Sequence, residues 1–212
     1  MPEPAAIVFD VAVKGETRYG EWGGGVVMVE KTKCTLYSGG MKGAEAAFGE
    51  AAEKWGLQEV NFSYEDHVMA RDKHVVILSE DELARGDISM ELASKMMNRT
   101  YYEKKKIRKV LQSIFHMVNK GHQVFAVGKI LEDNTVKGGT GWAVELARLF
   151  NRAVSVYDQE RKAWFIWKEG AWKPDTPKIV FDTIAGSGTR NLTDDGRAAI
   201  DDLFERSFGP SR

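Results

Sequence analysis

A strand, a glycine-rich loop and a helix follow one another three times along the chain, within residues 34–55, 123–150 and 178–207. Each strand segment is a run of apolar residues, and each helix segment repeats apolar residues at helical spacing. This alternation favours a parallel sheet with helices on both faces. Ligands of such sheets bind beyond the carboxyl ends of the strands, where all three loops are expected to gather.

The predicted fold is therefore α/β: a Rossmann-like, doubly wound and mostly parallel sheet. We expect an N-terminal strand extension over 1–33, with strands at 6–13 and 19–30, before a single compact domain over 34–212. Further strands are predicted at 34–37, 59–64, 74–79, 123–130 and 153–158, an aromatic β-hairpin at 163–172, and a strand beginning at 178 that runs into the third glycine loop. Helices are predicted at 44–56 with Gly56 as C-cap, at 80–120 with a break near 98–102, after the loop at 136–141, and from the N-cap Thr193 onward.

Composition gives few restrictions on function. The chain has 212 residues, which suits one sizeable domain, and 43% apolar with 29% charged residues is ordinary for a globular protein. The net charge of −1 disfavours wholesale nucleic-acid binding. The four histidines show no metal-ligand spacing, so we expect no metal and no other cofactor.

The compartment is predicted from what the sequence lacks. No apolar run reaches 18 residues, and the first ten residues have neither a basic stretch nor a long apolar core, so we expect neither a membrane span nor a signal peptide. Cys34 is the single cysteine and cannot form an intramolecular disulfide, which is typical of a reducing compartment. These features favour a cytoplasmic protein.

The three glycine loops read SGGMKG, KGGTGW and GSGTR. Glycine before a helix lets an anion approach unpaired backbone N–H groups that carry a partial positive charge. A single Gly-Gly can equally form a tight turn, but three loops at equivalent positions favour phosphate binding. No loop has the Walker A lysine, and GGTGWA matches the dinucleotide fingerprint poorly. The candidate phosphate-binding residues are Ser38, Gly39, Gly40, Gly43, Gly138, Gly139, Thr140, Gly141, Gly188, Thr189 and Arg190.

Around these loops the sequence resembles the SLOG superfamily, which joins the lysine-decarboxylase-like nucleotide phosphoribohydrolases to the DNA-processing protein A family. KGGTGWAVE resembles the phosphoribohydrolase signature Pro-Gly-Gly-x-Gly-Thr-x-x-Glu, with Lys137 in place of Pro and Trp142 in place of Thr. YSGGMKGAEAA resembles the family's other loop, with mild departures at Met41 and Glu45. IAGSGTR resembles a segment that usually comes first, so the chain is similar to a circularly permuted member.

The resemblance implies binding of a nucleotide or nucleotide-derived small molecule. It also implies that Glu145, with an arginine on the preceding helix, breaks an N-glycosidic bond, because a carboxylate can stabilise an oxocarbenium-like ribose. The equivalent of that arginine falls near Ser113, where the chain has none. Glu145 can alternatively be a first-turn partner of the helix dipole.

Other candidates keep two interpretations each. Asp158, at the end of a predicted strand, could accept a hydrogen bond from a ribose hydroxyl or open a turn. Asn98 and Arg99 could reach the ligand or form a helix junction. Ser38 and Thr140 could bind phosphate or cap helices.

Two surface features concern partners. The aromatic hairpin, with Trp164, Phe165, Trp167 and Trp172, is expected in the core or in a homodimer contact, and alternatively as a platform for a base. The basic run at 103–109 is typical of a solvated helix face, although it leaves nucleic acid as a less favoured partner.

Three functions thus follow from the sequence. The favoured one is binding of a nucleotide-like small molecule by a homo-oligomer. The alternatives are a nucleoside-monophosphate phosphoribohydrolase that uses Glu145, and an accessory protein of nucleic-acid processing.

Overall fold

The computed structural model describes residues 29–211. The predicted strand at 6–13 and most of the predicted strand at 19–30 lie outside these residues. Of the remaining N-terminal extension, Lys31–Lys33 form a short 3₁₀ helix, η1.

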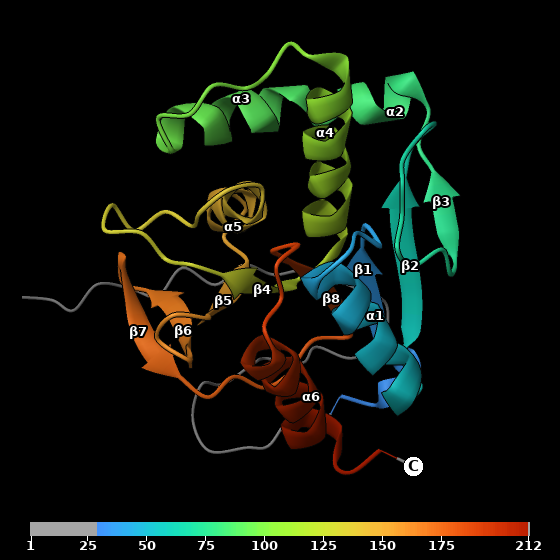
Figure 1. The fold of residues 1–212 in the computed structure, drawn as a ribbon, viewed down its shortest axis with the longest axis vertical. Helices are drawn as coiled ribbons and strands as arrows, with labels where there is room; N and C mark the ends of the chain where they lie inside the picture. Colours follow the sequence, from blue (N-terminus) through green and yellow to red (C-terminus); the bar gives the residue numbers. More distant parts are fainter. Residues whose placement is uncertain (1–28, 212) are drawn as a thin grey trace, which may run out of the picture.

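The protein has the predicted α/β architecture, with one eight-stranded sheet between two layers of helices (Figure 1). Its strands are β1 (Thr35–Ser38), β2 (Gln58–Ser63), β3 (Val75–Ile77), β4 (Gln123–Gly128), β5 (Ala153–Asp158), β6 (Ala163–Lys168), β7 (Ala171–Asp175) and β8 (Thr183–Gly188). Their order is β3-β2-β1-β8-β4-β5-β6-β7. The first six in this order are parallel, and the aromatic hairpin adds β6 and β7 antiparallel at one edge.

Two apolar clusters lie on opposite faces of the sheet. On one face, α1 (Ala44–Trp55) and α6 (Asp194–Phe208) pack together. Their buried sides contribute Phe48, Leu203 and Phe204, which are fully buried. On the other face lie α3 (Asp87–Met96), α4 (Lys105–Lys120) and α5 (Thr140–Leu149), and the short α2 (Glu80–Ala84) packs against α4. Both faces of the central strands are therefore buried, as their continuous apolar runs predict.

The chain winds outward from the centre of the sheet in both directions. The β1–α1–β2 unit proceeds toward the β3 edge on one face, whereas β4–α5–β5 proceeds toward the hairpin edge on the other face. Strand β8 lies between β1 and β4, at the point where the direction reverses. In doubly wound sheets this reversal opens a crevice at the carboxyl ends of the strands.

Helix ends follow the predicted caps. Gly56 adopts a left-handed conformation after α1 and its N–H bonds back to the last turn. The hydroxyl of Thr193 accepts a hydrogen bond from the Gly196 N–H at the start of α6. The predicted break near 98–102 separates α3 from α4.

The third strand–loop–helix unit differs from the prediction. We expected the strand to begin at 178 and GSGTR (186–190) to form a glycine loop, but the strand is Thr183–Gly188 and contains the first three residues of that loop. The cause is packing: a Cβ on Gly186 would lie 2.7 Å from Cγ of Phe48. Glycine in this central strand makes room for the aromatic ring of Phe48 on α1, and the loop itself begins only at Thr189.

Candidate functional site

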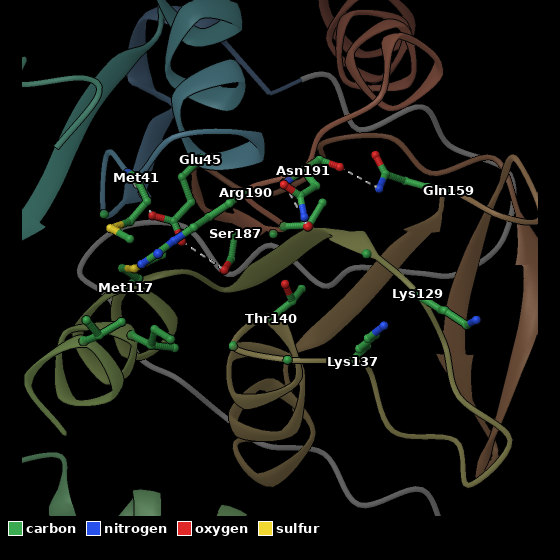
Figure 2. Close-up of a pocket in the computed structure, with 18 of the residues that line it drawn as sticks. Met41, Glu45, Met117, Lys129, Lys137, Thr140, Gln159, Ser187, Arg190 and Asn191 are labelled. Atoms are coloured by element: carbon green, nitrogen blue, oxygen red, sulfur yellow. Dashed lines mark hydrogen bonds between the residues drawn. The ribbon is translucent and has the colours of Figure 1, made fainter. Parts of the chain in front are cut away.

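A cavity of about 450 Å³ lies at the carboxyl ends of β1, β8 and β4. Its walls come from the loops after these strands and from the side of α4 (Figure 2). The lining residues are Gly39, Met41, Glu45, His67, Val110, Ser113, Ile114, Met117, Gly128, Lys129, Lys137, Gly138, Gly139, Thr140, Gln159, Glu160, Ser187, Gly188, Thr189, Arg190 and Asn191. Parts of all three glycine loops are thus brought to one cavity.

The loop before α5 presents unpaired backbone donors to this cavity. Among the residues that the structure describes, none accepts a hydrogen bond from the N–H of Gly138, Gly139 or Thr140. Gly138 has φ of 70°, a conformation that glycine adopts without strain, and it turns the chain into the helix. Three successive free N–H groups at a helix N-terminus are a suitable site for a phosphate or another anion.

Arg99 is hydrogen-bonded to this loop. Its guanidinium donates to the carbonyl oxygen of Gly138 over 3.3 Å and to Oγ1 of Thr135 over 2.9 Å. Arg99 does not line the cavity; it and Asn98, a left-handed residue at the end of α3, belong to the helix junction. The structure therefore places Arg99 where it positions the loop rather than where it touches a ligand.

Three cationic side chains line the cavity. Lys129 forms an ion pair with Glu160 over 2.7 Å. The side chains of Lys137 and Arg190 form no hydrogen bond or ion pair with any residue in the 29–211 range. Lys137 directly precedes the amide donors at 138–140 and makes this part of the cavity favourable for an anion. The Arg190 guanidinium lies on the Glu45 side of the cavity (Figure 2).

Glu45 lies in the opposite wall, in the first turn of α1. The residue is 7% exposed, and its carboxylate oxygens accept hydrogen bonds from the Met41 N–H over 3.2 Å and the Ser187 hydroxyl over 3.4 Å. Burial raises the pKa of the Glu45 carboxyl to about 7, although these two donors, the N–H of Gly39 and the charge of Arg190 act in the opposite direction. The first glycine loop consequently directs the N–H groups of Gly39 and Met41 to the carboxylate of Glu45.

Gly40 and Gly43 serve close chain contacts and do not line the cavity. A Cβ on Gly43, where φ is 99°, would lie 2.3 Å from the Thr189 carbonyl oxygen, and one on Gly40 would lie 2.3 Å from the Arg71 carbonyl oxygen. Glycine at position 43 lets the first and third loops meet, and glycine at position 40 lets the first loop contact the segment between β2 and β3. Ser38 is also away from the cavity: it is fully buried, and its hydroxyl donates to the Gly186 carbonyl oxygen.

Asp158 takes the turn role that was one of its two interpretations. It is 1% exposed, and its carboxylate accepts hydrogen bonds from the N–H groups of Ile130, Glu160 and Arg161. These bonds fix the loops after β4 and β5, so Asp158 supports the cavity wall without lining it.

Glu145 does not line the cavity either. Its buried carboxylate forms an ion pair with Arg148 over 2.9 Å, and Arg148 in turn stacks on the ring of Trp167 in the aromatic hairpin. Burial raises the pKa of Glu145, and Arg148 opposes that shift. Gly141 is likewise outside the lining. It packs against the backbone of Val136, since a Cβ on Gly141 would lie 2.1 Å from the Val136 carbonyl oxygen.

The sequence did not single out Glu45, Lys137 or Lys129 as functional residues. Glu45 was treated as a mild departure from a family motif. Its position just after a glycine loop could have indicated a carboxylate in the first helical turn, near the carboxyl end of the preceding strand. Ser113, where the resemblance placed the missing arginine, does line the cavity, and its hydroxyl donates to the Val110 carbonyl oxygen over 2.8 Å.

The described part of the chain contains neither a metal-binding cluster nor a helix able to span a membrane. No group of three or more His, Cys, Asp or Glu residues within 29–211 is arranged to hold a metal ion. No helix among these residues has both the length and the apolar composition needed to cross a bilayer.

Comparison with protein-family models, with curated proteins and with solved structures found no match for this chain.

Proposed function

We propose that the protein binds a nucleotide or another phosphorylated small molecule in this cavity, with its phosphate on the N–H groups of Gly138, Gly139 and Thr140. The observation that carries the proposal is the row of three unpaired amides in residues that line the cavity. The unpaired side chain of Lys137 supports it, because it adds positive charge next to these amides, and Arg190 adds positive charge to another wall of the same cavity. A cavity of about 450 Å³ falls within the usual range for small-molecule sites.

Gly139 offers a sharp test of this proposal. A Cβ at this position meets no atom within 4 Å, and the backbone is in the ordinary helical region, so substitution should leave the fold intact. Gly139→Asp places a carboxylate at the proposed anion site, and Gly139→Asn places a neutral group of the same shape there. Repulsion between two unit charges about 5 Å apart is of order 3 kcal/mol at an effective dielectric constant of about 20.

Binding should be measured by titration calorimetry with nucleoside mono- and diphosphates and with ribose 5-phosphate. Gly139→Asp is expected to bind at least about a hundredfold more weakly than Gly139→Asn. Lys137→Ala should weaken binding, and Lys168→Ala, on the hairpin and outside the cavity lining, is the matched control. Equal affinities of the Asp and Asn variants would remove the basis of the proposal.

The two alternative functions receive less support from the geometry. A hydrolase that uses Glu145 would need this carboxylate at the cavity, and Glu145 is paired with Arg148 elsewhere. In the basic run at 103–109, Arg108 and Lys109 are already paired with Asp87 and Glu80, which lowers its free charge for nucleic acid.

A further inference from the structure

The walls of the cavity differ in chemistry from one end to the other. In Figure 2, Lys129 and Lys137 lie on one side, and Glu45, Met41 and Met117 lie on the other. An anion suits the first side. The second side combines a buried carboxylate and the Arg190 guanidinium with apolar atoms, so it suits a different part of the same ligand.

Glu45 has unused hydrogen-bonding capacity at this second side. An ionised carboxylate offers about four acceptor positions. Three donors among the described residues act on it: the N–H groups of Met41 and Gly39 and the Ser187 hydroxyl, and the Met41 and Ser187 contacts are longer than 3.0 Å. Arg190 shares the cavity, but it forms neither a hydrogen bond nor an ion pair with Glu45. A buried carboxylate with an unfilled acceptor position is costly to ionise unless a ligand supplies a further donor.

The surroundings of Glu45 suggest the shape of the donor-bearing group. Met41, Ile114 and Met117 line the cavity, and methionine and isoleucine side chains pack well on flat, weakly polar rings. Gly39 keeps this space open, because a Cβ there would lie 2.7 Å from a Glu45 carboxylate oxygen. A nitrogen heterocycle would therefore contact thioether and alkyl groups with its faces and the carboxylate with its edge.

We propose that Glu45 selects the ligand by accepting a hydrogen bond from an amino group on a nitrogen heterocycle. This inference rests on the proposed function, since it assigns the ring of the nucleotide to the Glu45 side and the phosphate to residues 138–140. It names the substrate class: nucleotides whose base carries an exocyclic amino group.

The test compares nucleotides that differ by one amino group. GMP and IMP form one such pair, and AMP and purine riboside 5′-monophosphate form a second, because hydrogen replaces the amino group in the second member. A hydrogen bond to a charged group corresponds to roughly a ten- to hundredfold change in affinity. The wild-type protein is expected to bind the amino member of at least one pair about tenfold more tightly or better.

Variants then assign the preference to Glu45. Glu45→Met removes both acceptor oxygens and should bring the ratio of affinities within about twofold of unity, and Glu45→Gln keeps one acceptor and should give an intermediate ratio. Ribose 5-phosphate, which has no base, should bind these variants as it binds the wild type. A thermal melt of each variant establishes that it is folded. The ratio of affinities of the paired nucleotides for the wild-type protein tests the proposal without any variant.

The outcomes separate this inference from the proposed function. If both pairs bind equally well to the wild type, or if the preference survives in Glu45→Met, the role of Glu45 is refuted while phosphate binding stands. If neither the nucleotides nor ribose 5-phosphate bind, both proposals fall.

Discussion

Replacing Glu45 with glutamine should stabilise the protein, and the gain should depend on pH. The carboxyl is buried, and desolvation raises its pKa from 4.5 to about 7. Between these two values the folded protein holds a proton that the unfolded chain has released. Stability that this group contributes at low pH is therefore lost as the pH rises through this window.

The size of the effect follows from the same shift. A difference of one pKa unit corresponds to about 1.4 kcal/mol, so raising the pH from 5 to 8 should lower the contribution of Glu45 to the unfolding free energy by about 2 to 3 kcal/mol. Glutamine is neutral at both pH values. Its amide can still accept a hydrogen bond from the Met41 N–H and donate one to the Ser187 hydroxyl, so the wild-type contacts can be kept.

Urea denaturation of ligand-free protein at pH 5 and pH 8 measures the difference. The advantage of Glu45→Gln over the wild type should be about 2 to 3 kcal/mol larger at pH 8 than at pH 5. Glu50→Gln serves as the control, because Glu50 lies on the same helix as Glu45. It removes an exposed ion pair with Arg197 of α6 and should change stability by less than about 1 kcal/mol. An advantage of the same size at both pH values would refute the claim that Glu45 is desolvated.

Three further outcomes are expected. Gly43→Ala should destabilise the protein by at least about 2 kcal/mol in urea denaturation, because a side chain at this left-handed position meets the Thr189 carbonyl oxygen; a loss below about 0.5 kcal/mol would contradict the close contact. Arg99→Ala should weaken nucleotide binding about tenfold in calorimetry, since the Gly138 carbonyl loses its donor, and unchanged affinity would show that the loop holds its own conformation. Leu203→Ala should cost about 2 to 5 kcal/mol of unfolding free energy, because the residue lies on the buried face of α6, and a loss below about 1 kcal/mol would contradict that packing.

Much of the fold could be predicted from local patterns. Apolar runs and helical spacing placed β4, β5 and α6 within a residue or two and the start of α5 within one residue, because these elements are strongly periodic. The start of β8 could not be placed in this way. Its glycines are typical of a loop, and only the packing of Gly186 against Phe48 explains why they lie in a central strand.

The site shows a similar division. The glycine loops were predicted to gather at one edge of the sheet, and Gly39, Gly138, Gly139 and Gly188 do line one cavity. Sequence could not distinguish glycines that face the cavity from those, such as Gly43, that let two loops touch. It also could not show that the carboxylate at the cavity is Glu45, since side-chain direction and burial depend on the tertiary packing.

The most direct test of phosphate binding follows the backbone amides themselves. In an NMR titration of ¹⁵N-labelled protein with a nucleoside monophosphate, the amide resonances of Gly138, Gly139 and Thr140 should shift together and saturate at the affinity found by calorimetry. Saturable binding that leaves these three resonances unmoved, while others shift, would contradict the account.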